Sequence, residues 1–333
     1  MSIRLLPSRR SLALSALAAL VCATFLPHAA RAQAWPSKPV TLVVPFPAGG
    51  GPDLTARLIG EKLAARIGQP VVVDNKPGAG ALLGAGVVAK ATPDGHTLLL
   101  SPNTLVISPH VLAPGAGGGV DVQKDLLPVV APATTPMVLV ANPQLGAKDL
   151  KAALELARKT PGLPYGSAGN GSPMHFAGEM LKKSAKVDLL HVPYKGVAPS
   201  ITAALSGEVK LLYVGLGGAV PHIKAGKLVP LAVTERARSN LMNTVPTATE
   251  QGVAGVEVNA WYGVFAPAAT PAAVAQKINQ EINEVLKDAG VRDKLMAAGI
   301  EPLGGSAQQL ADFVKADHQR YGALAKELNI KAD

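Results

Sequence analysis

Two glycine-rich segments of the sequence are suited to binding an anion through the backbone. The first segment, residues 45–53, reads Pro-Phe-Pro-Ala-Gly-Gly-Gly-Pro-Asp, and the second segment, residues 164–173, reads Pro-Tyr-Gly-Ser-Ala-Gly-Asn-Gly-Ser-Pro. Glycine lets a ligand approach main-chain amides that a Cβ atom would shield. Each segment leads into a helix-like stretch, whose first turn offers N–H groups and the positive end of the helix dipole. The pair predicts two halves of one carboxylate site, and a tight turn without ligand is the alternative for each.

The hydrogen-bond donors of both segments match the needs of a carboxylate. We expect its oxygens to accept hydrogen bonds from the amides around Ala48 to Gly50 and from Ser167, Asn170 and Ser172. Asp53 has two interpretations: it contacts an amine of the ligand, or it only stabilises its own helix start.

Further polar and aromatic residues follow strands at positions from which they can reach the same ligand. His175 lies one turn into the helix after the second segment, where it either faces the ligand or orients Ser172. Tyr194 can wall an organic ligand and Lys195 can balance a second carboxylate, or the ring packs under the loop and the lysine is solvated. Thr104 follows the third strand, at the edge where parallel sheets hold ligands, unless it only helps to start the next helix.

Motifs of the common enzyme classes are missing from the sequence. Ser167 lacks the glycine two residues earlier that a nucleophile elbow needs, and Leu54 occupies the place of the third glycine of a dinucleotide fingerprint. No pair of histidines has metal-ligand spacing; the histidines considered are His96, His110, His175, His191, His222 and His318. A hydrolase that uses Ser167 or Ser172 with His175 is the rival function. The sequence favours a non-enzymatic binding protein without cofactor or metal.

Alternating strand and helix patterns position these residues. In the first part we expect strands over 40–44, 71–73 and 96–100 and helices over 54–67 and 82–89. Farther along we expect strands over 137–140, 165–167, 189–192, 210–214 and 228–233, with helices over 150–159 and 174–186. Ser172 is the expected N-cap of the helix that Pro173 begins. From Pro271 onward helices are expected over 271–287, 291–298 and 307–328, the last behind a Ser306 cap.

The chain of 333 residues exceeds the usual size of one domain. A proline-punctuated extended stretch over 128–136 and a return stretch between Gly252 and Gly263 read as two crossings between two α/β blocks. We therefore predict a hinge-linked, two-lobed α/β protein, each lobe a mostly parallel sheet flanked by helices. Residues 33–132 and 260–333 form the first predicted lobe, and residues 133–259 form the second.

The first 32 residues read as a secretory signal peptide. A basic start is followed by the apolar run 12–26 and by small-residue cleavage patterns that end at Ala32 or Ala34. Cys22, the only cysteine, lies in this leader, so the mature chain has no disulfides. The leader holds four arginines and no acid, which reduces the formal charge from +9 to +5 (9 − 4) in the mature chain. That mild charge suits an acidic small ligand and does not require nucleic acid.

Seven ordered motifs together carry a family resemblance that covers essentially all of the mature chain. They are Pro-Ser-Lys-Pro at 36–39, Val-Pro-Phe-Pro-Ala-Gly-Gly-Gly-Pro-Asp at 44–53, Asp-Asn-Lys-Pro-Gly-Ala-Gly at 74–80, Pro-Asp-Gly-His-Thr-Leu-Leu at 93–99, Tyr-Gly-Ser-Ala-Gly-Asn-Gly-Ser at 165–172, His-Val-Pro-Tyr-Lys-Gly at 191–196 and Pro-His-Ile-Lys-Ala-Gly-Lys-Leu at 221–228. With them the sequence resembles the Bug family, the periplasmic solute receptors of tripartite tricarboxylate transporters.

The resemblance implies a two-lobed α/β fold like that of periplasmic binding proteins. It also implies a monomeric receptor that closes on a small mono- or dicarboxylate and works with the membrane subunits of the transporter. A sensor that presents the bound acid to a membrane signalling partner is the alternative. The loops matching 46–53 and 165–172 are implied to hold the carboxylate. The expected ligand contacts are Phe46, Ala48, Gly49, Gly50, Asp53, Thr104, Ser167, Asn170, Gly171, Ser172, His175 and Tyr194. The sequence departs from the family pattern at 101–104, 113–119 and 214–218, so no particular ligand is inferred.

Overall fold

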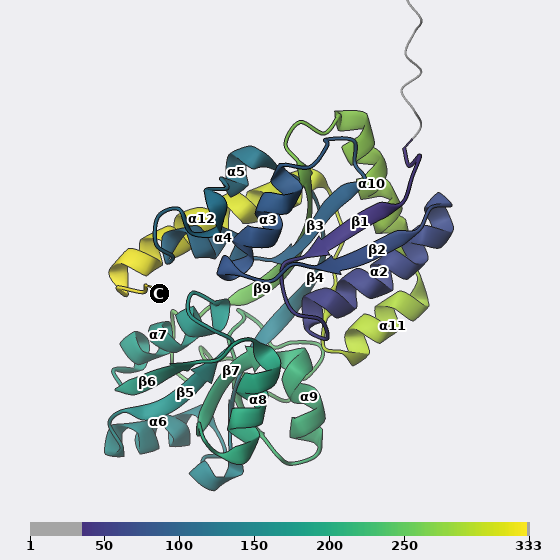
Figure 1. Cartoon of the computed structure of the whole chain (residues 1–333). Coiled ribbons are helices and arrows are strands. Elements are labelled where there is room, and N and C mark those ends of the chain that lie inside the picture. The colour runs from purple at the N-terminus through teal and green to yellow at the C-terminus, as the bar shows by residue number, and fades with distance from the viewer. Residues whose placement is uncertain (1–34, 332–333) are drawn as a thin grey trace, which may run out of the picture.

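The computed structural model describes residues 35–331 (Figure 1). The signal peptide predicted over residues 1–32 and its cleavage positions lie outside these described residues. Within them the chain forms two α/β lobes, each a sheet with helices on both faces (Figure 1). The predicted two-lobed fold is therefore confirmed.

The sheet of the first lobe joins three parallel strands to an antiparallel neighbour. The parallel strands are β1 (Val40–Val44), β2 (Val71–Asn75) and β3 (Thr97–Pro102), and β9 (Asn259–Pro267) runs antiparallel beside β3. One face packs against α2 (Gly51–Ile67), α10 (Ala272–Val285) and α11 (Ala289–Ala297). The other face packs against α3 (Leu82–Ala89), α4 (Thr104–Ile107) and α12 (Ala307–Glu327).

The sheet of the second lobe repeats this arrangement. Its parallel strands are β5 (Leu163–Ser167), β6 (Leu189–Pro193) and β7 (Leu211–Gly215), and β8 (Val229–Val233) pairs with the strand shared between the lobes. Helices α6 (Leu150–Lys159) and α7 (Pro173–Ala185) contribute to one buried cluster. Helices α8 (Val197–Ser206) and α9 (Leu216–Lys224) contribute to the other.

Strand β4 (Leu126–Ala141) runs through both sheets. Its first part pairs with β9, and its last part pairs with β7 and β8. The sequence had predicted a crossing over 128–136 and a separate strand over 137–140, and the structure joins them into one strand of 16 residues. The register with β9 shifts between Pro128 and Val130 and between Val130 and Ala133, where the prolines of β4 lack the N–H that a sheet needs. The lobe boundaries predicted at 132/133 and 259/260 fall inside β4 and β9 and stay a prediction.

Several helix bounds differ from the sequence-based ones. Helix α2 begins at Gly51 instead of residue 54, with Gly50 as N-cap, because proline fits the first helical turn without the N–H it lacks. The predicted caps Ser172 of α7 and Ser306 of α12 are both present, each accepting an N–H of its helix. Shorter elements are α5 (Val122–Asp125), β10 (Glu301–Pro302) and 3₁₀ turns at Ala79–Ala81, Ser108–His110, Ala116–Gly118 and Pro143–Leu145. No helix within residues 35–331 has both the length and the apolar character to cross a bilayer.

Candidate ligand site at the facing edges of the two sheets

The strand registers place the carboxyl ends of the parallel strands of one lobe opposite those of the other. Pro102 at the end of β3 pairs with Tyr262, which pairs with Ala133 of β4, while Gly215 at the end of β7 pairs with Met137 of β4. The four-residue step from 133 to 137 corresponds to about 13 Å along a strand. The first segment follows β1, and the second segment covers the end of β5 and the loop after it. Both segments therefore lie at these facing edges (Figure 1).

Asp53 organises the first segment. Its carboxylate, 3% exposed, accepts the Gly49 N–H (2.9 Å), two guanidinium N–H groups of Arg57 (2.9 and 3.0 Å) and the Asn75 side-chain amide (3.0 Å). Burial alone would raise the pKa of Asp53, but the hydrogen bonds from Arg57, Gly49 and Asn75 together hold it below its usual value. These bonds fit the interpretation that Asp53 stabilises its own helix start, and its contact with a ligand stays a prediction.

The rest of the first segment presents its backbone to solvent. Ala48 and Gly49 are exposed, Gly50 is half-buried, and the Phe46 carbonyl accepts the Asn75 side-chain amide at 3.0 Å. At its N-terminus, α2 leaves the N–H groups of Gly50, Gly51 and Asp53 without an acceptor inside the helix. A Cβ at residue 51 would lie 2.4 Å from the Tyr262 hydroxyl, whereas a Cβ at residue 50 would meet nothing closer than 3.8 Å. Packing therefore requires the glycine at 51 but not the one at 50.

The two serines of the second segment hydrogen-bond within it. Ser167 is fully buried, and its Oγ lies 2.7 Å from His191 Nε2 and accepts the Gly169 N–H at 3.1 Å. Ser172 Oγ accepts the His175 backbone N–H (3.3 Å) and donates to the Gly169 carbonyl (2.7 Å). The Asn170 side chain is exposed. Both hydroxyls thus shape the loop, and their predicted contact with a ligand stays a prediction.

Two histidines lie together beneath the second segment. The rings of His175 and His191 stack with centroids 3.7 Å apart and planes 9° from parallel, and His175 Nδ1 accepts the Gly171 N–H at 3.2 Å. Burial and the nearby Lys182 lower the pKa of His175 to about 4, and burial and His175 lower that of His191 to about 3. His175 Nδ1 is therefore occupied by a backbone amide of the loop, and the predicted contact of His175 with a ligand stays a prediction. The rival hydrolase needs the ring of His175 beside a serine hydroxyl. In the structure His175 Nδ1 accepts the backbone N–H of Gly171, and the Ser167 hydroxyl contacts His191 instead.

Sequence reasoning did not single out His191. It was grouped with scattered histidines, although it opens the motif at 191–196. In the parallel register of β5 and β6 it lies opposite Tyr165, two residues before Ser167. Pairing the predicted strands 165–167 and 189–192 in this register would have placed His191 beside the second segment.

Tyr194, Lys195 and Thr104 border the same edges. Tyr194 donates its backbone N–H to the Ser167 carbonyl (3.1 Å) and its hydroxyl to Glu208 (2.7 Å), and burial together with Glu208 raises its pKa to about 12. Lys195 is exposed. Thr104 is half-buried and begins α4 directly after β3. The structure brings these residues to the carboxyl ends of the strands, and a ligand contact for each stays a prediction.

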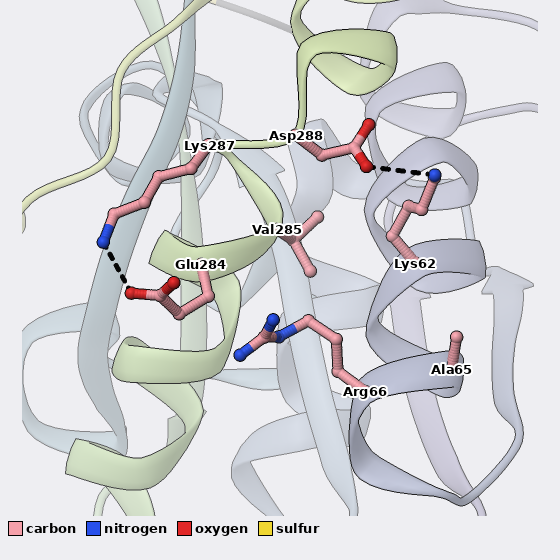
Figure 2. Close-up of a pocket in the computed structure, with 7 residues that line it drawn as sticks. All are labelled: Lys62, Ala65, Arg66, Glu284, Val285, Lys287 and Asp288. Atoms are coloured by element: carbon pink, nitrogen blue, oxygen red, sulfur yellow. Dashed lines mark hydrogen bonds and ion pairs between the residues drawn. The ribbon is translucent and has the colours of Figure 1, made fainter.

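Two hollows in the described part of the chain lie away from the two segments. The first, about 370 Å³, lies between α2 and the region of α10 and α11, and its charges are paired: Lys62 with Asp288 (3.1 Å) and Lys287 with Glu284 (2.6 Å) (Figure 2). The second, about 340 Å³, lies between α7 and α12, where its lining includes Met180 and Leu324. Neither is lined by the two segments. Within residues 35–331 no cluster of three or more His, Cys, Asp or Glu side chains is arranged to hold a metal ion.

The two lobes share strand β4, and in each lobe a helix begins after a glycine-rich segment at the facing sheet edges. This arrangement defines a two-lobed solute-binding protein. The family model "Tripartite tricarboxylate transporter family receptor" matches residues 55–330. The chain therefore belongs to this receptor family. It is 39% identical over 317 residues to the UPF0065 protein in the tcbD-tcbE intergenic region of Pseudomonas sp. strain P51, covering 95% of this chain and 94% of that protein. It is 32% identical over 302 residues to the protein BugT of Bordetella pertussis (90% and 92% covered), which agrees with the Bug resemblance.

Two solved structures of similar proteins hold organic acids. R. palustris Rpa4515 with adipate superposes with a TM-score of 0.84 at 34% identity, covering 90% of this chain and all of that one. MatC (Rpa3494) from Rhodopseudomonas palustris with bound malate superposes with a TM-score of 0.79 at 33% identity, with 87% and 99% covered. These likenesses extend over both lobes.

Proposed function

We propose that this chain is a periplasmic, non-enzymatic receptor that captures a small organic mono- or dicarboxylate between its lobes and presents it to the membrane subunits of a tripartite tricarboxylate transporter. The observation that supports this most is the position of two glycine-rich strand-to-helix segments at the facing edges of the two sheets. The acids in the two similar structures support a carboxylate as the ligand class.

In this proposal the carboxylate accepts hydrogen bonds from both segments at once. The donors on one side are the amides of Ala48, Gly50 and Gly51, since the Gly49 N–H is bonded to Asp53. Those on the other side are the amides of Ala168 and Asn170 with the exposed Asn170 side chain. Bonds to a charged acceptor contribute about 1.5–3 kcal/mol each. Four such bonds at about 3 kcal/mol each give about 12 kcal/mol. An association cost of about 4 kcal/mol then leaves the roughly 8 kcal/mol of a micromolar complex.

Calorimetry on the purified mature protein tests the ligand class. We expect adipate, malate or a related acid to bind with a micromolar Kd, and the diamide of the same acid to bind at least about a hundredfold more weakly, because it cannot accept charge-assisted hydrogen bonds. Equal binding of the acid and its diamide would contradict a carboxylate site.

A glycine variant tests the contribution of the first segment. Gly50 has φ −82° and open space around its Cβ position, so Gly50→Ala is compatible with the fold. We expect its methyl group to shield the neighbouring amides and to weaken acid binding at least about tenfold. Gly86→Ala in α3 is the matched control, since its Cβ would meet only the Gly117 carbonyl, at 3.6 Å. Unchanged affinity of Gly50→Ala would remove this segment from the site.

Export and oligomeric state complete the proposal. We expect N-terminal sequencing of protein from the periplasm to begin directly after Ala32 or Ala34, and light scattering to give the mass of a monomer.

Deletion of the gene separates transport from sensing. Loss of acid uptake supports transport, whereas intact uptake with loss of an acid-induced transcriptional response indicates the sensor.

A further inference from the structure

We propose that the stacked rings of His175 and His191 are a clamp that holds the second segment in its ligand-binding shape, which makes both histidines positioning residues for the loop amides. Only the last step of this inference, the effect on ligand affinity, rests on the proposed function. The loop shape itself can be measured without any ligand.

Each ring holds one end of the loop. His191, from β6, lies with Nε2 2.7 Å from Ser167 Oγ at the end of β5. His175, from α7, accepts the N–H of Gly171 one residue before the helix cap. The nearly parallel stacking at 3.7 Å joins the two rings. A side chain that supported only one end would leave the other free to change its backbone angles, and Gly169 (φ 133°) and Gly171 (φ 69°) permit such changes.

The hydrogen-bond network assigns the ring proton of His175. Because His175 Nδ1 accepts an N–H, its proton lies on Nε2. The Gly169 carbonyl accepts the Ser172 hydroxyl at 2.7 Å and the Ser167 hydroxyl at 3.2 Å. In the contact of 2.7 Å between Ser167 Oγ and His191 Nε2, the tautomer of His191 decides which group donates. The clamp thus consists of two stacked neutral rings, with the proton of His175 on Nε2.

The surroundings keep both rings neutral at physiological pH. The titratable groups that face them are Glu179 and Lys182 from α7 and Tyr165 from β5, and these are bonded to one another: Lys182 to Glu179 (2.8 Å) and the Tyr165 hydroxyl to Glu179 (2.8 Å). Burial lowers the pKa of both histidines. Protonation of His175 would remove the acceptor for Gly171 and place a charge against its stacked partner. The clamp should therefore hold near neutral pH and fail in acid.

Nuclear magnetic resonance of the mature protein, without ligand, tests the clamp directly. With ¹⁵N-labelled histidine at pH 7 we expect both rings to be neutral and His175 to be unprotonated at Nδ1. Amide hydrogen exchange of Gly169 and Gly171 is the second readout. We expect His175→Leu and His191→Leu to speed this exchange at least about tenfold, the scale of one lost hydrogen bond.

Conservative variants separate positioning from simple packing. Asn at 175 places an acceptor near the position of Nδ1, and Gln at 191 places a polar group near that of Nε2. His175→Asn and His191→Gln should therefore restore slow exchange to within about threefold of the wild-type protein, by the same hydrogen-bond scale. His222→Leu, on α9, is the histidine control and should leave the loop amides unchanged.

A proton on His175 Nδ1 at pH 7, or wild-type exchange rates in both leucine variants, would overturn the clamp. The failure of the proposed function would look different. If the leucine variants lose the loop protection and yet bind adipate or malate as the wild-type protein does, the clamp stands and the second segment is not a ligand contact.

Discussion

The rings of Phe176 and Tyr321 meet edge to face, with centroids 4.9 Å apart and planes at 80°. Phe176 belongs to α7 of the second lobe, yet it is fully buried in the hydrophobic cluster of the first lobe, together with Val111 and Tyr321. A Cβ at Gly171 would lie 2.4 Å from the Val111 side chain, so the second segment contacts the first lobe as well. The start of α7 therefore serves both the candidate site and the contact between the lobes.

Truncating Phe176 should loosen the two lobes. We expect Phe176→Ala to lower the free energy of unfolding by about 3–5 kcal/mol, the usual cost of removing a buried ring, and to increase the radius of gyration measured by small-angle X-ray scattering. Phe265→Ala is the control, because Phe265 is equally buried but lies on β9 within the first lobe. It should destabilise the protein without separating the lobes. An unchanged radius in Phe176→Ala would show that this ring does not hold the lobes together.

Two N-cap serines give a matched test of the second segment. Ser172 caps α7 at the candidate site, and Ser306 caps α12 in an exposed capping box. Serine to alanine at either cap should lower the free energy of unfolding by about 1 kcal/mol. Only Ser172→Ala should also weaken acid binding, by about tenfold or about 1.4 kcal/mol, because it releases the Gly169 carbonyl. Calorimetry on both variants checks this, and an equal effect on affinity would assign Ser172 a purely structural role.

Glu235 should make stability depend on pH. It follows β8, its Oε1 accepts the Met137 N–H of β4 at 2.8 Å, and its buried Oε2 has no hydrogen-bond partner among the described residues. Burial, with repulsion from Glu301, raises the pKa of Glu235 from 4.5 to about 8. The folded protein therefore keeps a proton that the unfolded chain releases between these pH values, so this contribution to stability falls as pH rises through the window.

Glu235→Gln keeps the neutral form and the acceptor for Met137. Compared with the wild-type protein, the variant should gain free energy of unfolding between pH 5 and pH 8.5, as measured by urea denaturation. The lowered pKa values of His175 and His191 have the opposite effect, because they make folding more favourable as pH rises. This effect is the same in both proteins, so it cancels in the difference between their free energies of unfolding. A difference that stays constant with pH would show that Glu235 titrates normally.

Local patterns predicted the parts of the fold that depend on local chemistry. The caps at Ser172 and Ser306 and the early proline of α7 could be read from the sequence, because each acts on its own helix end. The glycine-rich segments were found for the same reason. Tertiary contacts explain what was missed. The continuity of β4 depends on its pairing with β9 and β7, and Phe176 looks in the sequence like any apolar residue of α7.

The candidate site shows the same division. The sequence located both segments and predicted that the serine hydroxyls contact the ligand, which stays a prediction. It did not predict their bonds to Gly169 and His191. Asp53 was ambiguous because its partners Arg57 and Asn75 come from a helix turn and from a neighbouring strand. Such choices depend on which groups the folded chain brings within hydrogen-bond distance, and spacing in the sequence does not contain that information.

The central claim is that one carboxylate contacts both segments, and titration of amide resonances tests it most directly. Adipate, malate and acetate are added in turn to ¹⁵N-labelled mature protein. For at least one acid, the amides of Gly50 and Gly51 and those of Ala168 and Asn170 should shift together along a single binding curve with one Kd. Shifts confined to one segment would contradict this claim. The absence of shifts in both segments, with an acid that calorimetry shows to bind, would contradict it as well.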